Sequence, residues 1–150
     1  MALSQYDVGH PSQPPVHIEA CDLGVGTRVP VVFLWGEFDL ETVPLIERFL
    51  RQRFGPFFYR RTIMLDLAGV TLVDSSFISF VVALTRQLRA ERQELILTRP
   101  GRQVSRILAL VGVPNLVPVY GSLDDAVKAV SGGTVPCLPP PFPAPEAARA

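Results

Sequence analysis

The 150-residue sequence has few cysteines, few histidines and no long apolar run. Its two cysteines, Cys21 and Cys137, lie far apart and form neither a metal-binding spacing nor a disulfide framework. No apolar stretch approaches the ~18 residues that a membrane-spanning helix needs. The first 15 residues lack the basic start and apolar stretch of a signal peptide. We therefore expect a cytoplasmic protein with no membrane span, no metal ion and no other cofactor.

An excess of charge of one sign is also missing. Acidic and basic residues number 14 each, so the formal net charge is zero. This balance argues against a nucleic-acid or anionic-lipid partner that binds through bulk charge. Arginines do cluster in residues 48–61, beside Phe57, Phe58 and Tyr59 in a proline-flanked turn. We interpret this cluster as a solvated helix face with a hydrophobic plug, and expect no nucleic-acid partner.

The composition predicts one folded domain with two tails. Hydrophobic residues make up 48% of the chain and charged residues 19%, which is typical of a globular domain. Residues 1–15 are polar, contain Pro11, Pro14 and Pro15, and are predicted to be a flexible N-terminal segment. Residues 131–150 are rich in proline, which predicts a disordered, extended tail. The folded domain should then cover residues 16–130.

Within these residues, short apolar runs alternate with helical repeats. The predicted strands are residues 16–21, 29–35, 62–67, 94–98 and 117–120. The predicted helices are residues 43–54 and the repeats within 77–88, 104–111 and 123–130. Alternating strands and helices imply right-handed crossovers and parallel strands, whereas the short first turn makes the opening pair antiparallel. The predicted fold class is α/β, with a mixed, mostly parallel five-stranded sheet and four helices.

Two loops are candidates for a functional site, because functional residues in such sheets follow the carboxyl ends of strands. One loop is Gly36-Glu37-Phe38-Asp39, and the other runs from Gly69 to Ser76. Ser75 or Ser76 suits the N-cap of the next helix, where its side-chain bond would stabilise by roughly 1 kcal/mol. Capping alone would explain a serine at this position.

Phosphorylation is a second explanation for a serine at this helix start. A phosphate on Ser75 would face amide donors, but it would also lie beside the carboxylates of Asp74 and, if the two loops meet, Asp39. A charge near −2 about 6 Å from one carboxylate costs roughly 1–5 kcal/mol for dielectric constants between 80 and 20. That cost would change a partner's affinity by roughly tenfold to a thousandfold or more. One modification could therefore switch binding.

Several motifs occur in an order that resembles a known family. Gly36-Glu37-Phe38-Asp39 matches a Gly-Glu-x-Asp loop, and the segment from Met64 to Phe77 matches a strand and switch that end in Asp-Ser-Ser/Thr-Gly. Residues 94–97, 108–113 and 117–126 continue the match. Over residues 16–130 the sequence resembles a STAS domain, in particular a bacterial anti-sigma factor antagonist.

The resemblance implies a STAS fold and a regulator without catalytic activity. Such an antagonist binds an anti-sigma factor, usually an ATP-binding serine-protein kinase, and so frees a sigma factor to join RNA polymerase. The kinase phosphorylates the serine after the switch aspartate, here Ser75, with Ser76 as a minor acceptor or cap, and a PP2C-type phosphatase resets the protein. A homodimer is also compatible with the family. The implied partner-binding residues are Glu37, Asp39, Asp74, Ser75, Ser76 and Phe77.

Phe77 departs from the family pattern, which has glycine after the serine pair. Its ring either extends the apolar stripe of the helix into the core or protrudes and reshapes the surface that meets the kinase. The second arrangement leaves room for a role without phosphorylation. The alternative function is a non-catalytic STAS scaffold or a regulatory subunit, in a stress-signalling assembly or a lipid transporter.

Enzymatic alternatives lack the residues that they need. A serine hydrolase would need a histidine, but His10 and His17 lie at the N-terminal edge, and the sequence contains no Gly-x-Ser-x-Gly motif. Asp66 could suggest a phospho-receiver, yet the acidic pair for Mg²⁺ and the late lysine are missing. We instead expect Asp66 to bond the turn that follows its strand.

Overall fold

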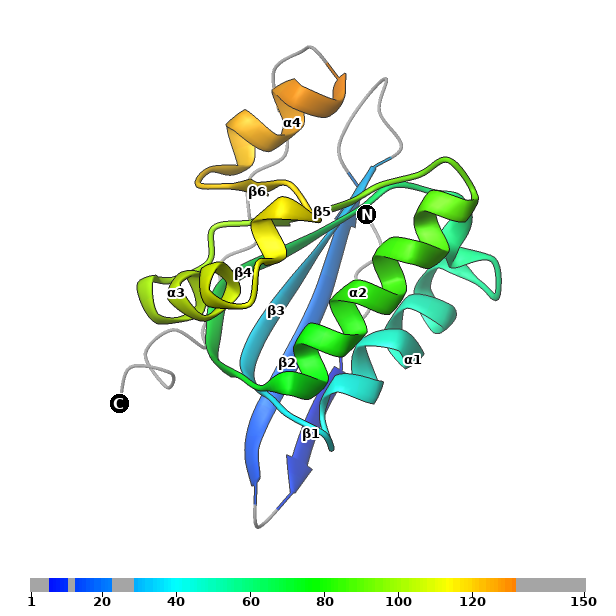
Figure 1. Cartoon of the computed structure of the whole chain (residues 1–150). Coiled ribbons are helices and arrows are strands. Elements are labelled where there is room, and N and C mark those ends of the chain that lie inside the picture. Colours follow the sequence, from blue (N-terminus) through cyan, green and yellow to red (C-terminus); the bar gives the residue numbers. More distant parts are fainter. Residues whose placement is uncertain (1–5, 11–12, 23–28, 132–150) are drawn as a thin grey trace.

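A six-stranded sheet runs through the described part of the chain, which comprises residues 6–10, 13–22 and 29–131 of a computed structural model (Figure 1). The strands lie side by side in chain order. The β1–β2 and β2–β3 pairs are antiparallel, and the β3–β4, β4–β5 and β5–β6 pairs are parallel. The strands are β1 (Tyr6–His10), β2 (Gln13–Asp22), β3 (Pro30–Phe38), β4 (Ile63–Val73), β5 (Leu95–Thr98) and β6 (Val119–Tyr120).

The helices cover the two faces of the sheet unequally. They are α1 (Val43–Phe54), α2 (Ser75–Ala90), α3 (Arg102–Leu110) and α4 (Leu123–Ser131), with single 3₁₀ turns η1 (Phe58–Arg60) and η2 (Val113–Asn115). Buried residues of α1, α2 and α3 share the larger hydrophobic core with one face of the sheet. Buried residues of α4 join a smaller core on the other face. Figure 1 shows α1 and α2 side by side across the larger core.

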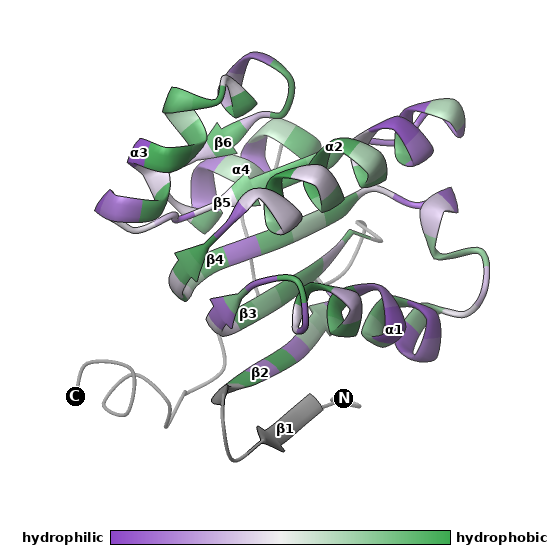
Figure 2. Ribbon diagram, turned by 60° about the horizontal axis from the view of Figure 1, so that its bottom comes forward, coloured by the Kyte–Doolittle hydropathy of each residue, from purple (hydrophilic) through white to green (hydrophobic). Residues whose placement is uncertain are grey.

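Hydrophobic periodicity explains the strands and helices that form the larger core. In β3, Val32 and Leu34 contribute to this core, whereas Val31 and Phe33 point into the smaller one. A strand buried on both faces requires the continuous apolar run that the sequence shows. In α1 the buried residues Val43, Ile46, Phe49 and Leu50 follow the helical repeat, and Gly55 ends the helix with φ of +91°. In Figure 2 most of the ribbon of β3 and β4 has the green colour of hydrophobic residues.

The predicted α/β class and the mixed, mostly parallel sheet are confirmed, but the sheet has one more strand than expected. Residues 6–10, predicted to be flexible, form β1 and pair with β2, with Tyr6 opposite Ile18 and Val8 opposite Val16. This strand satisfies the backbone groups of β2, which would otherwise lie at an open edge. Residues 1–5, and the predicted tail except for Ser131, lie outside the described residues.

Strands β3 and β4 continue into both segments that the sequence predicted to be loops. Glu37 pairs with Leu72, and Phe38 pairs with Val73, so each strand ends one residue before an aspartate. The indole of Trp35 lies against Gly69, where a Cβ atom would overlap the ring. Glycine therefore lets β4 pass under Trp35 without breaking the pairing of the two strands.

Asp66 lies in the middle of β4 and not at its end, and it joins β4 to β5. It is 1% exposed, and its carboxylate accepts hydrogen bonds from the hydroxyl of Thr98 (2.8 Å) and from the Arg99 guanidinium (2.8 and 2.9 Å). The expected bond to a following turn is not formed, because β4 continues to Val73; the amide of Ala68, which donates to Asp66 at 3.4 Å, belongs to the same strand. A buried carboxylate with these donors stabilises the strand pair, whereas an unpaired one would be costly.

Candidate partner-binding site

The two sequence-predicted loops meet at one edge of the sheet. Because Phe38 and Val73 are paired on neighbouring parallel strands, Asp39 and Asp74 leave the sheet next to each other. Neighbouring strands are roughly 4.8 Å apart. Asp39 leads into α1 and Asp74 into α2, so both helices begin at this edge. The site is therefore built from two strand ends and two helix starts.

The Asp39 carboxylate holds its own turn. Its Oδ1 atom accepts hydrogen bonds from the backbone amides of Glu41 (3.0 Å) and Thr42 (3.1 Å). The Thr42 hydroxyl accepts a bond from the Asp39 amide (2.9 Å) and donates to the carbonyl of Glu37 (2.8 Å). Asp39 and Glu37 are half-buried. Glu37 and Asp39 therefore lie at the edge where the sequence predicts a binding surface. Asp39 also stabilises the turn before α1, a role that the sequence analysis did not assign.

Asp74 is the N-cap of α2, which corrects the expectation that Ser75 or Ser76 would cap the helix. The Asp74 Oδ1 atom accepts hydrogen bonds from the amides of Ser76 (2.8 Å) and Phe77 (3.4 Å). Its backbone is extended, with φ of −127° and ψ of −168°, as an N-cap residue requires. A carboxylate also suits the positive end of the helix dipole. Aspartate therefore takes the capping position one residue before the serines.

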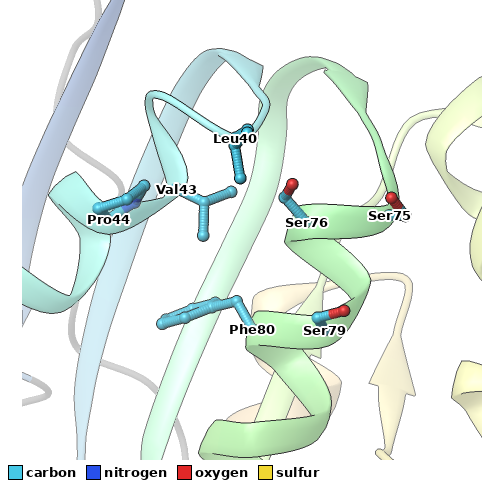
Figure 3. A pocket seen from close by; sticks show the side chains of 7 residues that line it. All are labelled: Leu40, Val43, Pro44, Ser75, Ser76, Ser79 and Phe80. Atoms are coloured by element: carbon cyan, nitrogen blue, oxygen red, sulfur yellow. The ribbon is translucent and has the colours of Figure 1, made fainter.

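With the cap supplied by Asp74, the serine side chains remain at the surface. Ser75 is exposed and Ser76 is half-buried. In Figure 3 the Ser76 hydroxyl points toward Leu40, whereas Ser75 lies on the side of α2 farther from α1. The Ser75 side chain is thus exposed to solvent at the start of α2.

A groove of about 410 Å³ separates the starts of α1 and α2 (Figure 3). Leu40 is 75% exposed and stands at its upper rim, and the half-buried ring of Phe80 lies across the groove from Pro44. Apolar side chains that remain exposed around a concave surface are typical of a protein-binding site. The groove is lined by Leu40, Val43, Pro44, Ser75, Ser76, Ser79 and Phe80.

Phe77 does not belong to the partner-binding surface, which corrects its place in the predicted set. Its side chain is 0% exposed, and its ring centroid lies 6.3 Å from that of Phe38. The third helical position faces the core, so the ring fills space beneath the two strand ends. A buried aromatic pair thus supports the turns at Asp39 and Asp74 from below.

The sequence analysis missed Leu40, Pro44 and Phe80. Phe80 belongs to the apolar repeat within residues 77–88 and packs against the larger core, but it is only half-buried because it lies at the margin of the helix stripe, over the groove. Leu40 carried a usable signal: it is a large apolar residue directly after the acidic turn, outside every strand and helix. Its side chain remains exposed at the rim of the groove, and exposed apolar residues that gather around a groove are typical of a contact surface.

Other types of site find no support among the described residues. No three acidic, histidine or cysteine side chains come close enough there to hold a metal ion. His17 lies 3.5 Å from Glu19 and packs edge-on against Trp35, on the sheet face opposite α2 and away from Ser75. In residues 6–10, 13–22 and 29–131, no helix is long and apolar enough to cross a membrane.

Comparisons with solved structures agree with this fold. The Thermotoga maritima protein TM1081, described as a candidate anti-sigma factor antagonist, superposes with a TM-score of 0.64 at 20% identity. The match covers 72% of this chain and 92% of TM1081. The anti-sigma factor antagonist SpoIIAA in its unphosphorylated form superposes with a TM-score of 0.58 at 22% identity, over 75% of this chain and 97% of SpoIIAA.

Comparisons with sequences give a similar relative and also a family model that matches. A Thermotoga neapolitana protein, named as a candidate anti-sigma factor antagonist and TM1081 homologue, is 23% identical over 96 residues. These residues make up 64% of this chain and 84% of that protein. A family model described as "Mlab, STAS domain" matches residues 22–118, which is more than half of the chain. The chain belongs to the STAS domain family.

Proposed function

We propose that this domain is an anti-sigma factor antagonist, and that phosphorylation of Ser75 switches it off. The observation that carries the proposal is the exposed Ser75 at the start of α2, beside two carboxylate-bearing turns and an apolar groove. The anti-sigma factor, a serine kinase that brings its own ATP, would dock over the groove. Its sequestration would release a sigma factor, and a PP2C-type phosphatase would restore the unmodified antagonist.

The helix cap supports the direction of the switch. Asp74 already occupies the amides of Ser76 and Phe77, so a phosphate on Ser75 does not obtain these donors unless it displaces the carboxylate. The phosphate charge therefore adds to that of Asp74 at the rim of the groove. A partner that docks against this rim would remove water from the phosphate and from the Asp74 carboxylate. Because these like charges repel each other more strongly without water, the partner loses affinity.

Phosphorylation by a candidate kinase, followed by mass spectrometry, tests the proposal. We expect wild type and Ser76→Ala to be labelled and Ser75→Ala to remain unlabelled. Ser79→Ala is the matched control, because Ser79 is an exposed serine on the same groove, one turn further along α2. Labelling of Ser75→Ala at wild-type level would move the acceptor to another residue and refute the assignment.

A second candidate is a non-catalytic STAS subunit that binds its partner permanently in a larger assembly. Two observations favour it: the family model that matches carries the description "Mlab, STAS domain", and the groove has an apolar rim formed by Leu40, Pro44 and Phe80. Under this function Ser75 contacts the partner and is never modified. Ser75→Ala would then weaken assembly, whereas no kinase from the same cells would label the wild type.

A further inference from the structure

The opposite end of the α1–α2 layer carries a second surface feature, which we call the arginine–aromatic end. Here the last turn of α1, the Gly55–Phe57 turn and η1 come together before β4 begins. Both Arg51 and Arg53 lie in the last turn of α1. The arginine–aromatic end consists of Arg51, Arg53, Phe54, Phe57, Phe58, Tyr59, Arg60 and Arg61.

Each arginine of this end lies over an aromatic ring. Arg53 and Arg61 both approach Phe54, with Cζ atoms 5.1 and 5.0 Å from the ring centroid. The Cζ atom of Arg51 is 5.3 Å from the centroid of Phe58. The shortest contact joins Arg60 to Phe57, at 4.3 Å. A guanidinium that stacks on a ring keeps its N–H groups in a fixed plane, ready for carboxylates.

Part of this arrangement is explained by the fold alone. Cations near the end of α1 compensate the negative end of its dipole, and the ring of Phe58 is 1% exposed and belongs to the core. Phe57 does not belong to the core, and its ring meets that of Tyr59 edge-on, with the centroids 6.1 Å apart. Phe57 is 53% exposed at a turn of the chain, and the guanidinium of Arg60 covers one face of its ring. A large exposed ring among guanidinium groups is what a binding partner would use.

The charge of this end selects the type of partner. Arg51, Arg53 and Arg60 form ion pairs with Glu47 (3.0 Å), Asp22 (3.3 Å) and Glu91 (3.6 Å). Much of the local positive charge is therefore compensated. Nucleic acids and anionic membranes bind through uncompensated charge, whereas protein interfaces use arginine and aromatic residues for directed contacts.

We propose that the arginine–aromatic end is a second protein-binding surface, for a partner that presents carboxylates around an apolar pocket. Phe57 enters the pocket, and Arg61, which forms no ion pair within the described part of the chain, pairs with one carboxylate. The exposed Arg60 exchanges its 3.6 Å pair with Glu91 for a second carboxylate of the partner. The 16 residues of α2 separate this end from the Ser75 groove by about 24 Å along the helix axis. One domain can therefore bind a partner at each end, and the second site does not depend on the function proposed for Ser75.

Photo-crosslinking in the cells that make the protein tests this surface. The full chain would carry p-benzoylphenylalanine in place of Phe57, and irradiation should give one discrete protein adduct. The crosslinked peptide, identified by mass spectrometry, should contain aspartate or glutamate. Adding Arg60→Gln and Arg61→Gln should reduce the adduct by at least about tenfold. The matched control places the same probe at Leu110, which is 79% exposed on α3 and should not give this adduct.

The outcomes separate this surface from the Ser75 groove. Survival of the adduct in a Ser75→Asp background supports two independent sites. An adduct with lipid or nucleic acid, the same adduct from Leu110, an adduct that the arginine changes leave intact, or no adduct would each overturn the proposal. Thermal unfolding followed by circular dichroism should show that the Arg60→Gln and Arg61→Gln variant remains folded.

Discussion

The two ends of the α1–α2 layer use the same helices in opposite ways. At the N-terminal ends the helices expose amide donors, and carboxylates of Asp39 and Asp74 satisfy donors at the two turns. At the C-terminal end of α1 arginines take the corresponding role, and they stack on phenylalanines. The aspartates before α1 and α2 and the arginines in the last turn of α1 each suit the polarity of the helix dipole. Function must then be inferred from the exposed residues that take no part in capping, which are Ser75 at one end and Phe57 at the other.

One phenylalanine at each end gives the sharpest contrast in stability. Phe77→Ala should lower the free energy of unfolding by about 3–5 kcal/mol, because it empties a buried site beside Phe38. Phe57→Ala, at the exposed turn, should change it by about 0.5 kcal/mol or less. Urea unfolding of both variants measures the difference. A similar loss in both would show that Phe57 is structural and would weaken its assignment as a binding residue.

Binding should separate the ends in the reverse sense. Under the proposed function, Ser75→Asp should weaken the binding of the anti-sigma factor by roughly tenfold or more, since it adds negative charge beside Asp74. The free energy of unfolding should change by about 0.5 kcal/mol or less. Arg60→Gln, at the other end, should leave this affinity unchanged. Isothermal titration calorimetry with the partner provides both values. Unfolding of Ser75→Asp at ambient temperature would instead identify Ser75 as a structural residue.

The role of Asp74 as helix cap predicts a smaller effect on stability. Asp74→Ala should lower the unfolding free energy by about 1 kcal/mol, because the amides of Ser76 and Phe77 lose their acceptor. Asp74→Asn is the matched control, since asparagine caps helices about as well as aspartate. Chemical denaturation can measure whether Asp74→Asn is as stable as the wild type and Asp74→Ala is less stable. Equal stability of the alanine and asparagine variants would contradict the capping role.

The smallest effect is expected among the paired arginines. Arg51→Gln should destabilise by about 0.5 kcal/mol or less at low salt, because both members of the Arg51–Glu47 pair are about half exposed. At roughly 1 M salt the Debye length falls to about 3 Å, and most of this difference should disappear. Unfolding at the two salt concentrations tests this screening. A loss of several kcal/mol that salt does not reduce would show that Arg51 holds Phe58 in place by packing.

The order of strands and helices was predictable because local patterns encode it. The limits of α1 were predicted correctly, since its apolar repeat ends at Gly55-Pro56. The ends of β3 and β4 were not, because glycine, threonine and acidic residues at 36–39 and 69–76 look like loops. The strands continue there because each supplies the other's hydrogen bonds, and because Gly69 makes room for Trp35. Pairing across the sheet thus outweighs local propensity.

The residues of the candidate site that follow strands in a local motif could be predicted, whereas those whose position depends on packing could not. Asp39, Asp74 and Ser75 were found through their motif and their place after strands. Phe77 was placed on the surface among other possibilities, and only its packing against Phe38 assigns it to the core. Helix periodicity places Phe80 in the apolar stripe, and Phe80 does pack against the larger core. Periodicity could not show that one side of its ring stays open, because the neighbouring α1 determines that.

The sequence by itself determined the α/β class, the alternation of strands and helices and the position of Ser75 at a helix start. These properties depend on residues close together in the chain, whose periodicity and turn signals act locally. The tertiary structure alone decided that Phe77 is buried and that Leu40 and Phe80 border a groove. Both depend on how α1 and α2 pack against the ends of β3 and β4, and that packing joins segments that lie far apart in the chain.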